Sequence, residues 1–186
     1  MHDDSDIKIF KGKDEEADGA DLYALAEEMR RNIVNGNSAK AKELGIKLAS
    51  LSPDSDDLGE ELIKYVRNTA ADEEIKDQIV TLMLFCAEYT LLGELRPMLS
   101  ASATEAMYNV IKEKFPTFYN SISNGAAVSF YHLAVKKNRD VAKAIGESFA
   151  MLCEQDSKLI KTMGENVFTL TCEKVKETIA EYKFEK

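Results

Sequence analysis

The chain has 186 residues, of which 45% are hydrophobic, 8% aromatic and 31% charged, an ordinary globular composition that excludes a collagen-like or wholly disordered protein. The 33 acidic and 24 basic residues give a net charge of −9, and a surface of this sign repels the phosphates of nucleic acids. We therefore expect no nucleic acid partner.

The acidic charge is concentrated at the start of the chain. Residues 1–21 contain eight acidic residues and three lysines, and few apolar residues lie among them. Such a composition is typical of a solvated arm that does not join a hydrophobic core. We predict a mobile acidic tail over residues 1–18 and a single all-helical domain over residues 19–186.

Two features of the sequence bear on the cellular compartment. The first residues lack the basic start and the apolar run of a secretory signal, so we expect a cytoplasmic protein. The cysteines are odd in number, widely spaced and surrounded by apolar residues: Cys86, Cys153 and Cys172. This pattern predicts reduced thiols in the core, in preference to a metal site or a redox pair.

Apolar residues recur at helical spacing through the first half of the chain. The predicted helices there cover residues 21–34, 37–51, 54–66 and 72–92. The apolar face of the first consists of Leu22, Leu25, Ala26, Met29 and Ile33. It ends at Gly36, a residue suited to a left-handed helix stop. The fourth helix is hydrophobic around most of its circumference, so we expect it at the centre of the fold.

The second half continues the helical pattern. A fifth helix is predicted to begin near Ser100, a sixth follows Pro116, and the last two cover residues 140–155 and 156–182. No segment alternates with a period of two, so no sheet is expected. The predicted fold is all-α, a compact multi-helix bundle or an α/α array of about eight helices. Single glycines inside predicted helices indicate close helix crossings: Gly45, Gly59, Gly146 and Gly164.

An unusual segment runs from Phe115 to Val135, because these 21 residues contain no charged side chain. In so charged a chain, this composition predicts a helix buried at the centre of the molecule. The alternative is that its polar side chains line a ligand pocket made by Tyr119, Asn120, Asn124, Tyr131 and His132. On a continuous helix Asn120, Asn124 and Tyr131 share one stripe, whereas a break near Gly125 would separate them.

His132 is the one histidine outside the acidic start of the chain. With no second histidine nearby and no Glu-x-x-His motif, it predicts neither a metal site nor a bound cofactor. As a general base it would need a carboxylate from another helix, and Glu88, set among apolar residues, is the candidate. Glu88 therefore joins the residues of the predicted site.

The sequence contains no nucleotide-binding glycine loop, no hydrolase nucleophile motif and no zinc-protease motif. The favoured interpretation is a non-catalytic, cytoplasmic protein-interaction or scaffold module that engages another protein or a second copy of itself. The first alternative is a small-molecule-binding regulatory bundle with its pocket around Asn120, Asn124 and His132. The least favoured hypothesis is an enzyme that uses Glu88 and His132. No membrane partner is expected.

Overall fold

A computed structural model describes residues 15–51, 73–137 and 139–185. Over these ranges the chain forms eight α-helices and no strand, which confirms the predicted all-α fold. The helices are α1 (Glu15–Val34), α2 (Asn37–Leu48), α4 (Glu73–Glu94), α5 (Pro97–Lys114), α6 (Pro116–Asn124), α7 (Ala127–Lys137), α8 (Val141–Leu152) and α9 (Lys158–Glu181). The helix predicted over residues 54–66 lies outside the described residues.

The chain divides into two units after Gly36. The first unit contains α1, which begins at Glu15, inside the segment predicted as a tail; residues 1–14 lie outside the described ranges. Gly36 has a φ of +77°, a conformation that costs glycine little, and this confirms the predicted left-handed stop. The second unit begins at Asn37 and contains the other seven described helices.

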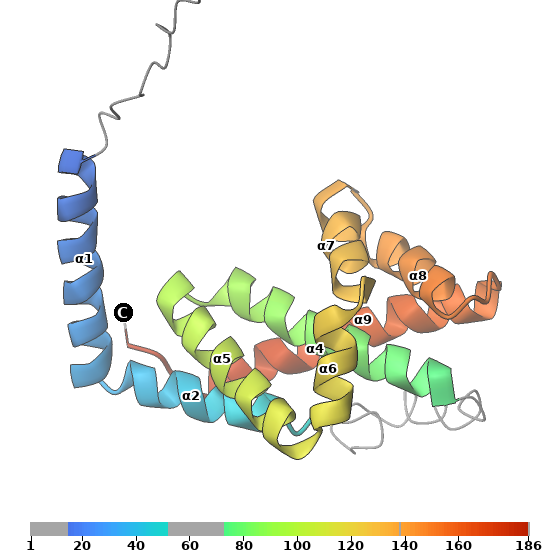
Figure 1. Cartoon of the computed structure of the whole chain (residues 1–186), viewed down its shortest axis with the longest axis horizontal. Helices are drawn as coiled ribbons and strands as arrows, with labels where there is room; N and C mark the ends of the chain where they lie inside the picture. Colours follow the sequence, from blue (N-terminus) through green and yellow to red (C-terminus); the bar gives the residue numbers. More distant parts are fainter. Residues whose placement is uncertain (1–14, 52–72, 138, 186) are drawn as a thin grey trace, which may run out of the picture. The chain divides into compact units, whose positions relative to one another are not determined.

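The interior of the second unit consists of two hydrophobic clusters. The first joins α4 with α7, α8 and the first half of α9: Ile79, Leu82, Phe85, Tyr131, Ile145, Phe149 and Met163. The second joins α2 and α5 with the later parts of α4 and α9: Leu44, Leu48, Leu91, Leu99, Met107, Ile111 and Val175. Since the clusters come in the same order along α4 and α9, these helices run parallel through the unit (Figure 1). Residues 81–87 of α4 are all buried, as predicted for a central helix.

Proline and capping side chains set several helix starts. Pro97 and Pro116 occupy the first turns of α5 and α6, where the missing N–H removes no helical hydrogen bond. The Asp140 side chain accepts a hydrogen bond from the Lys143 N–H (3.3 Å) at the start of α8. Ser157 Oγ accepts one from the Ile160 N–H (3.2 Å) at the start of α9. These caps satisfy backbone donors that the helices leave unpaired.

Three of the glycines predicted to mark close crossings do so. A Cβ atom on Gly45 would collide with the Ala103 carbonyl oxygen of α5. On Gly146 it would lie 2.5 Å from the Lys161 carbonyl oxygen, and on Gly164 it would lie 2.7 Å from Phe149 Cβ. The absence of a side chain therefore lets α2 approach α5, and α8 approach α9. Gly59 lies outside the described residues.

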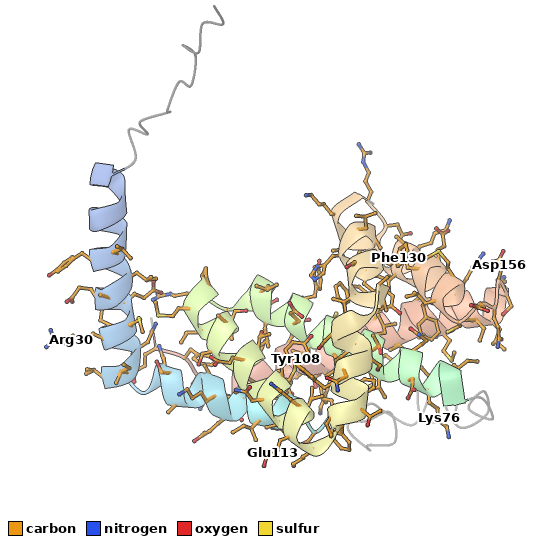
Figure 2. All side chains as sticks on the ribbon, in the orientation of Figure 1. Arg30, Lys76, Tyr108, Glu113, Phe130 and Asp156 are labelled. Atoms are coloured by element: carbon orange, nitrogen blue, oxygen red, sulfur yellow. The ribbon has the colours of Figure 1, made fainter. Side chains whose placement is uncertain are left out.

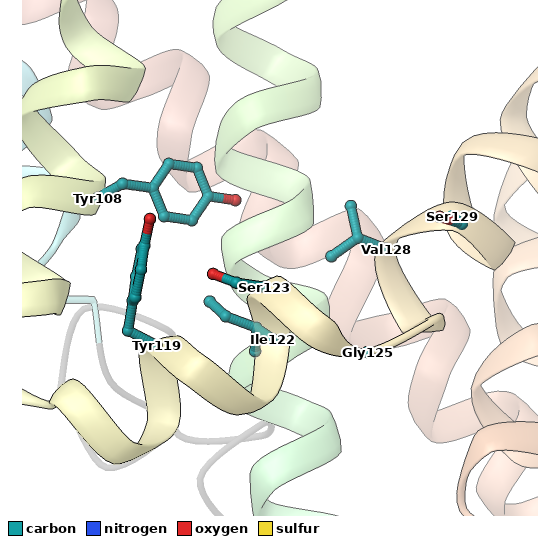
Figure 3. Close-up of a pocket in the computed structure, with 7 residues that line it drawn as sticks. All are labelled: Tyr108, Tyr119, Ile122, Ser123, Gly125, Val128 and Ser129. Atoms are coloured by element: carbon teal, nitrogen blue, oxygen red, sulfur yellow. The ribbon is translucent and has the colours of Figure 1, made fainter.

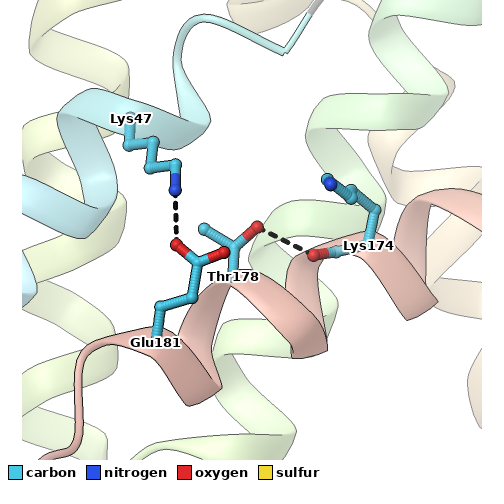
Figure 4. Close-up of polar contacts among 4 residues, drawn as sticks. All are labelled: Lys47, Lys174, Thr178 and Glu181. Carbon is cyan, nitrogen blue, oxygen red and sulfur yellow. Dashed lines mark hydrogen bonds and ion pairs between the residues drawn. The ribbon is translucent and has the colours of Figure 1, made fainter. Parts of the chain in front are cut away.

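Two polar contacts join α2 to the C-terminal part of the second unit. Lys47 Nζ lies 2.6 Å from Glu181 Oε2, an exposed ion pair between α2 and α9 (Figure 4). The Asn37 amide group is buried and bonds to the backbone of Glu185, donating to its carbonyl oxygen (2.8 Å) and accepting from its N–H (3.0 Å). The segment after α9 is therefore held against the start of α2.

The prediction that residues 115–135 form a buried central helix is wrong. The chain breaks at Gly125 into α6 and α7, so the stripe that Asn120, Asn124 and Tyr131 would share does not exist. Within residues 115–135, only Tyr131 and Ala134 are buried among the described side chains. The physical reason is that serine, asparagine and glycine are hydrated well enough to face water without any net charge.

Candidate functional site

The residues predicted to form one site are distributed over different places. Tyr119 lines a pocket formed by α5, α6 and α7, whereas His132 lines a larger pocket formed by α4, α7 and α9. Tyr131 is completely buried in the first hydrophobic cluster. Asn120 is exposed on α6 and lines neither pocket. Asn124 is the last residue of α6, and its side chain lies outside the described part of the structure.

The Tyr108 pocket, of about 320 Å³, lies where α6 ends and α7 begins (Figure 3). Its lining residues are Tyr108, Tyr119, Ile122, Ser123, Gly125, Val128 and Ser129. The rings of Tyr108 and Tyr119 meet edge to face, with their centroids 6.3 Å apart. The break at Gly125 creates the pocket, because it turns α7 away from the line of α6.

Glu88 belongs to the neighbourhood of Tyr108 and not to that of His132. The Tyr108 hydroxyl donates a hydrogen bond to Glu88 Oε2 (3.0 Å). Burial, followed by the charge of Glu88, raises the pKa of Tyr108 and keeps its hydroxyl protonated. His132 is exposed, and its ring stands edge-on to Phe85 with centroids 5.1 Å apart. The structure therefore does not bring together the predicted Glu88 and His132 pair.

The Cys172 pocket, of about 660 Å³, lies between the end of α4, α7, the first residue of α8 and α9. Its lining residues are Tyr89, Thr90, Leu92, Gly93, Glu94, His132, Val135, Lys136, Val141, Phe168, Cys172 and Lys176. Its volume is within the usual range of small-molecule sites, roughly 300 to 1,000 Å³. Large apolar side chains form its walls, and charged groups stand at its edge.

Two thiols meet beside this pocket. The half-buried Cys172 lines the pocket, and Cys86 of α4 lies behind it, completely buried. A hydrogen bond from the Cys86 thiol lowers the pKa of Cys172, aided by the Thr90 hydroxyl and by Lys176. Burial raises the pKa of Cys86. Cys86 and Cys153 are thus core thiols as predicted, whereas Cys172 is not fully enclosed.

Two surfaces expose large apolar side chains among the described residues. On α1, Leu22, Leu25, Met29 and Ile33 form what we call the apolar stripe, and their exposed fractions are 59%, 49%, 51% and 66%. In the second unit, the α7–α8 groove has a volume of about 310 Å³ and an exposed apolar rim. Its lining residues are Phe130, Leu133, Ala134, Ala144, Glu147, Ser148 and Met151. Figure 2 labels one of them, Phe130.

Sequence patterns alone do not identify the residues that complete these sites. Cys172 and Cys86 lie more than eighty residues apart and carry no shared motif, so only the parallel packing of α4 and α9 reveals their contact. No local motif links Tyr108 with Glu88, although the Tyr108 hydroxyl donates a hydrogen bond to that carboxylate. The apolar face of α1, in contrast, is predicted by residue spacing alone.

Among the described residues, no three His, Cys, Asp or Glu side chains gather closely enough to hold a metal ion. No helix in the described ranges combines the length and the apolar character needed to cross a bilayer. Comparisons of the chain with protein families, with curated proteins and with solved structures find no match.

Proposed function

We propose that the protein is a self-assembling interaction module in which the apolar stripe of α1 docks into the α7–α8 groove of a second copy. The observation that carries the proposal is the stripe itself, four large apolar side chains whose exposed fractions lie between 49% and 66%. Their spacing of three, four and four residues is typical of amphipathic helices that bind in hydrophobic grooves. A lone helix of 20 residues is only marginally stable in water, so a partner would stabilise α1.

The α7–α8 groove offers a surface of matching chemistry. Phe130, Leu133 and Met151 stand on its rim with exposed fractions of 41%, 50% and 51%. Each Å² of apolar surface that leaves water stabilises a complex by roughly 25 cal/mol, before the cost of association is subtracted. Docking therefore removes exposed apolar surface from water on both the helix and the groove.

Charge complementarity supports the same pairing. Three exposed cations lie at the end of α7, in the connection and at the start of α8: Lys136, Arg139 and Lys143. On α1, Glu27 and Glu28 lie next to the apolar stripe, together with Arg30 and Arg31, and the first 21 residues of the chain add a net charge of −5. Opposite charges around an apolar contact steer the encounter and fix the orientation of the docked helix.

A reciprocal exchange of α1 between two copies satisfies both surfaces. A stable and specific interface buries about 1,600 Å² in total, which is large for one short helix in one groove. Exchange uses the contact twice and gives a closed dimer with two-fold symmetry. We therefore expect a dimer in preference to an open chain of copies.

The test measures the molar mass of the full chain by size-exclusion chromatography with light scattering over a hundredfold range of concentration. Met29→Glu places a charge in the stripe and Leu133→Glu places one on the groove, and each variant is expected to be monomeric. A mixture of the two is expected to form a heterodimer that is weaker than the wild-type dimer and appears only at the higher concentrations, because one intact stripe still meets one intact groove. Ile46→Glu, at an exposed position on α2, is the matched control and should remain dimeric.

A wild-type protein that stays monomeric over the whole range would overturn the proposal. So would a dimer that survives Met29→Glu, because the contact would then lie elsewhere. Circular dichroism of each variant should retain the helical spectrum of the wild-type chain.

A further inference from the structure

We propose that the Cys172 pocket is a covalent binding site for small apolar α,β-unsaturated carbonyl compounds, with Cys172 as the nucleophile. The inference is independent of the self-assembly proposed above, since the pocket lies on α4, α7, α8 and α9 and uses a different surface. Three observations support it: the paired thiols, the apolar walls and an unsatisfied hydroxyl group beside the sulfur.

The nucleophile is prepared by its partner thiol. A hydrogen bond from the buried Cys86 thiol is the largest cause of the lowered pKa of Cys172. A thiolate, and not a thiol, attacks an electrophile, so the hydrogen bond raises the reactive fraction at neutral pH. Cys86 acts through Cys172 and is a positioning residue.

Charged groups on α4, α7 and α9 face this sulfur or its pocket, whereas α8 contributes only Val141. On α9, Lys176 lowers the pKa of Cys172 and Glu173 raises it. On α4, Glu94 pairs with Lys176 at 3.3 Å and moderates its effect. On α7, His132 and Lys136 line the pocket at its edge. The nearest cation is thus partly neutralised, which leaves the thiol pair as the main cause of activation.

The walls select an apolar ligand. Phe168 is buried, whereas Tyr89 and Leu92 are exposed by 37% and 57%, so a ligand would cover surface that now faces water. A chain of several carbons fits within about 660 Å³. The pocket therefore favours an electrophile with a hydrocarbon group over a small polar one.

Thr90 provides a donor for the carbonyl oxygen. Its residue is 3% exposed, it lines the pocket, and its Oγ1 has no hydrogen-bond partner of good geometry in the described part of the chain. A buried hydroxyl that makes no well-aligned hydrogen bond is destabilising. The same hydroxyl helps to lower the pKa of Cys172, which places it beside the sulfur, so a carbonyl oxygen that it bound would belong to a molecule within reach of that sulfur.

The reaction is a conjugate addition that needs no oxidant. The thiolate forms a carbon–sulfur bond to the β-carbon, and the π electrons move onto the carbonyl oxygen, which accepts a hydrogen bond from Thr90. The α-carbon then takes a proton from water, and the carbonyl is restored. The product is a thioether that contains all atoms of the ligand and one added proton.

The first experiment uses N-cyclohexylmaleimide and N-ethylmaleimide on the folded full chain, with labelled residues identified by mass spectrometry. Cys172 is expected to react before Cys153 and Cys86. The ratio of the cyclohexyl rate to the ethyl rate is measured for Cys172 and for glutathione. The ratio for Cys172 should be roughly tenfold larger, because the pocket buries the extra carbons of the cyclohexyl group. Leu92→Ser should remove that preference, whereas Leu159→Ser, at an exposed leucine outside the pocket, should retain it.

The second experiment follows the rate of labelling against pH. Cys86→Ala is expected to move the midpoint of the profile to higher pH, and Cys86→Ser, which retains a donor, should restore it. Labelling of Cys172 no faster than that of an unfolded chain, or an unchanged midpoint in Cys86→Ala, would overturn the proposal. Neither result depends on whether the protein dimerises.

Discussion

At Gly45 the backbones of α2 and α5 approach so closely that no side chain fits between them, because a Cβ atom would collide with the Ala103 carbonyl oxygen. Gly93, near the end of α4, has no atom within 4 Å of the same hypothetical position and is exposed. Both glycines lie inside helices, so they differ in packing and not in backbone conformation.

We expect Gly45→Ala and Gly93→Ala to change stability in opposite directions. Gly45→Ala forces two helices apart and should lower the free energy of unfolding by about 2 to 3 kcal/mol. Gly93→Ala removes backbone freedom from the unfolded chain and should raise it by about 0.5 to 1 kcal/mol. Urea denaturation followed by circular dichroism measures both, and equal effects of the two substitutions would contradict the packing at Gly45.

Tyr131 gives a prediction about pH. Its ring is fully buried and its hydroxyl has no hydrogen-bond partner among the residues described. Burial raises the pKa of Tyr131 above its ordinary value of 10.0. The unfolded chain therefore ionises first, and stability that is fully present below pH 10 is lost as the pH rises towards the folded pKa.

Tyr131→Phe should remove this loss. At pH 7 the variant is expected to be as stable as the wild type, or more stable by up to about 1 kcal/mol, because a buried group without a partner disappears. Between pH 9 and pH 11 its stability should fall less steeply, as measured by urea denaturation at each pH. Cys86, whose pKa burial also raises, still contributes a decline in both proteins. Parallel curves would contradict an unsatisfied Tyr131.

These residues also show how far the sequence could predict the site. A single histidine in an uncharged segment is conspicuous, which is why the sequence singles out His132. This residue lines the Cys172 pocket. Cys172 was missed because its properties come from Cys86 on another helix, and no local pattern records a contact of that kind. Periodicity identifies faces of helices, but it does not tell which faces meet.

At the scale of elements, α6 and α7 show which features a sequence predicts and which it does not. Pro116 indicates the helix start that the structure has, and a break near Gly125 is one of the two alternatives that the sequence leaves open. The burial of this segment was mispredicted, because uncharged polar residues such as Asn120 are equally compatible with a solvent-facing surface. The hydrogen bonds between α2 and the chain after α9 could not be predicted from local sequence patterns, because they join residues that are 148 positions apart.

The two contacts of α2 predict a clear contrast. Asn37→Ala leaves the backbone N–H and carbonyl of Glu185 without their side-chain partners and should lower the free energy of unfolding by about 1 to 3 kcal/mol. Lys47→Ala breaks an ion pair in which both side chains are more than half exposed, so it should leave stability nearly unchanged. Thermal and urea unfolding distinguish them, and a larger loss from Lys47→Ala would contradict the prediction.

At the scale of the whole molecule, α4 and α9 belong to both hydrophobic clusters. Neither cluster can lose its packing without disturbing a helix on which the other depends. The described helices of the second unit should therefore unfold together, although no fully buried side chain belongs to both clusters.

Leu44→Ala tests this coupling. Leu44 belongs to the second cluster, and its truncation should cost about 2 to 5 kcal/mol. If the unit is cooperative, the slowest-exchanging amides of α8, in the first cluster, should lose the same free energy of protection as those of α5. Hydrogen exchange monitored by mass spectrometry gives both values. Unchanged protection in α8 would instead indicate two independently unfolding halves.

The parallel pairing of α4 with α9 also fixes an order of events during synthesis. More than sixty residues separate the end of α4 from the start of α9, so α4 leaves the ribosome long before its partner exists. During that interval its most hydrophobic face has only the earlier helices and α5 to α8 to cover it, and contacts between distant segments are slow to form. The nascent chain thus completes its native state late, and a chaperone that shields α4 would act in the interval before α9 emerges.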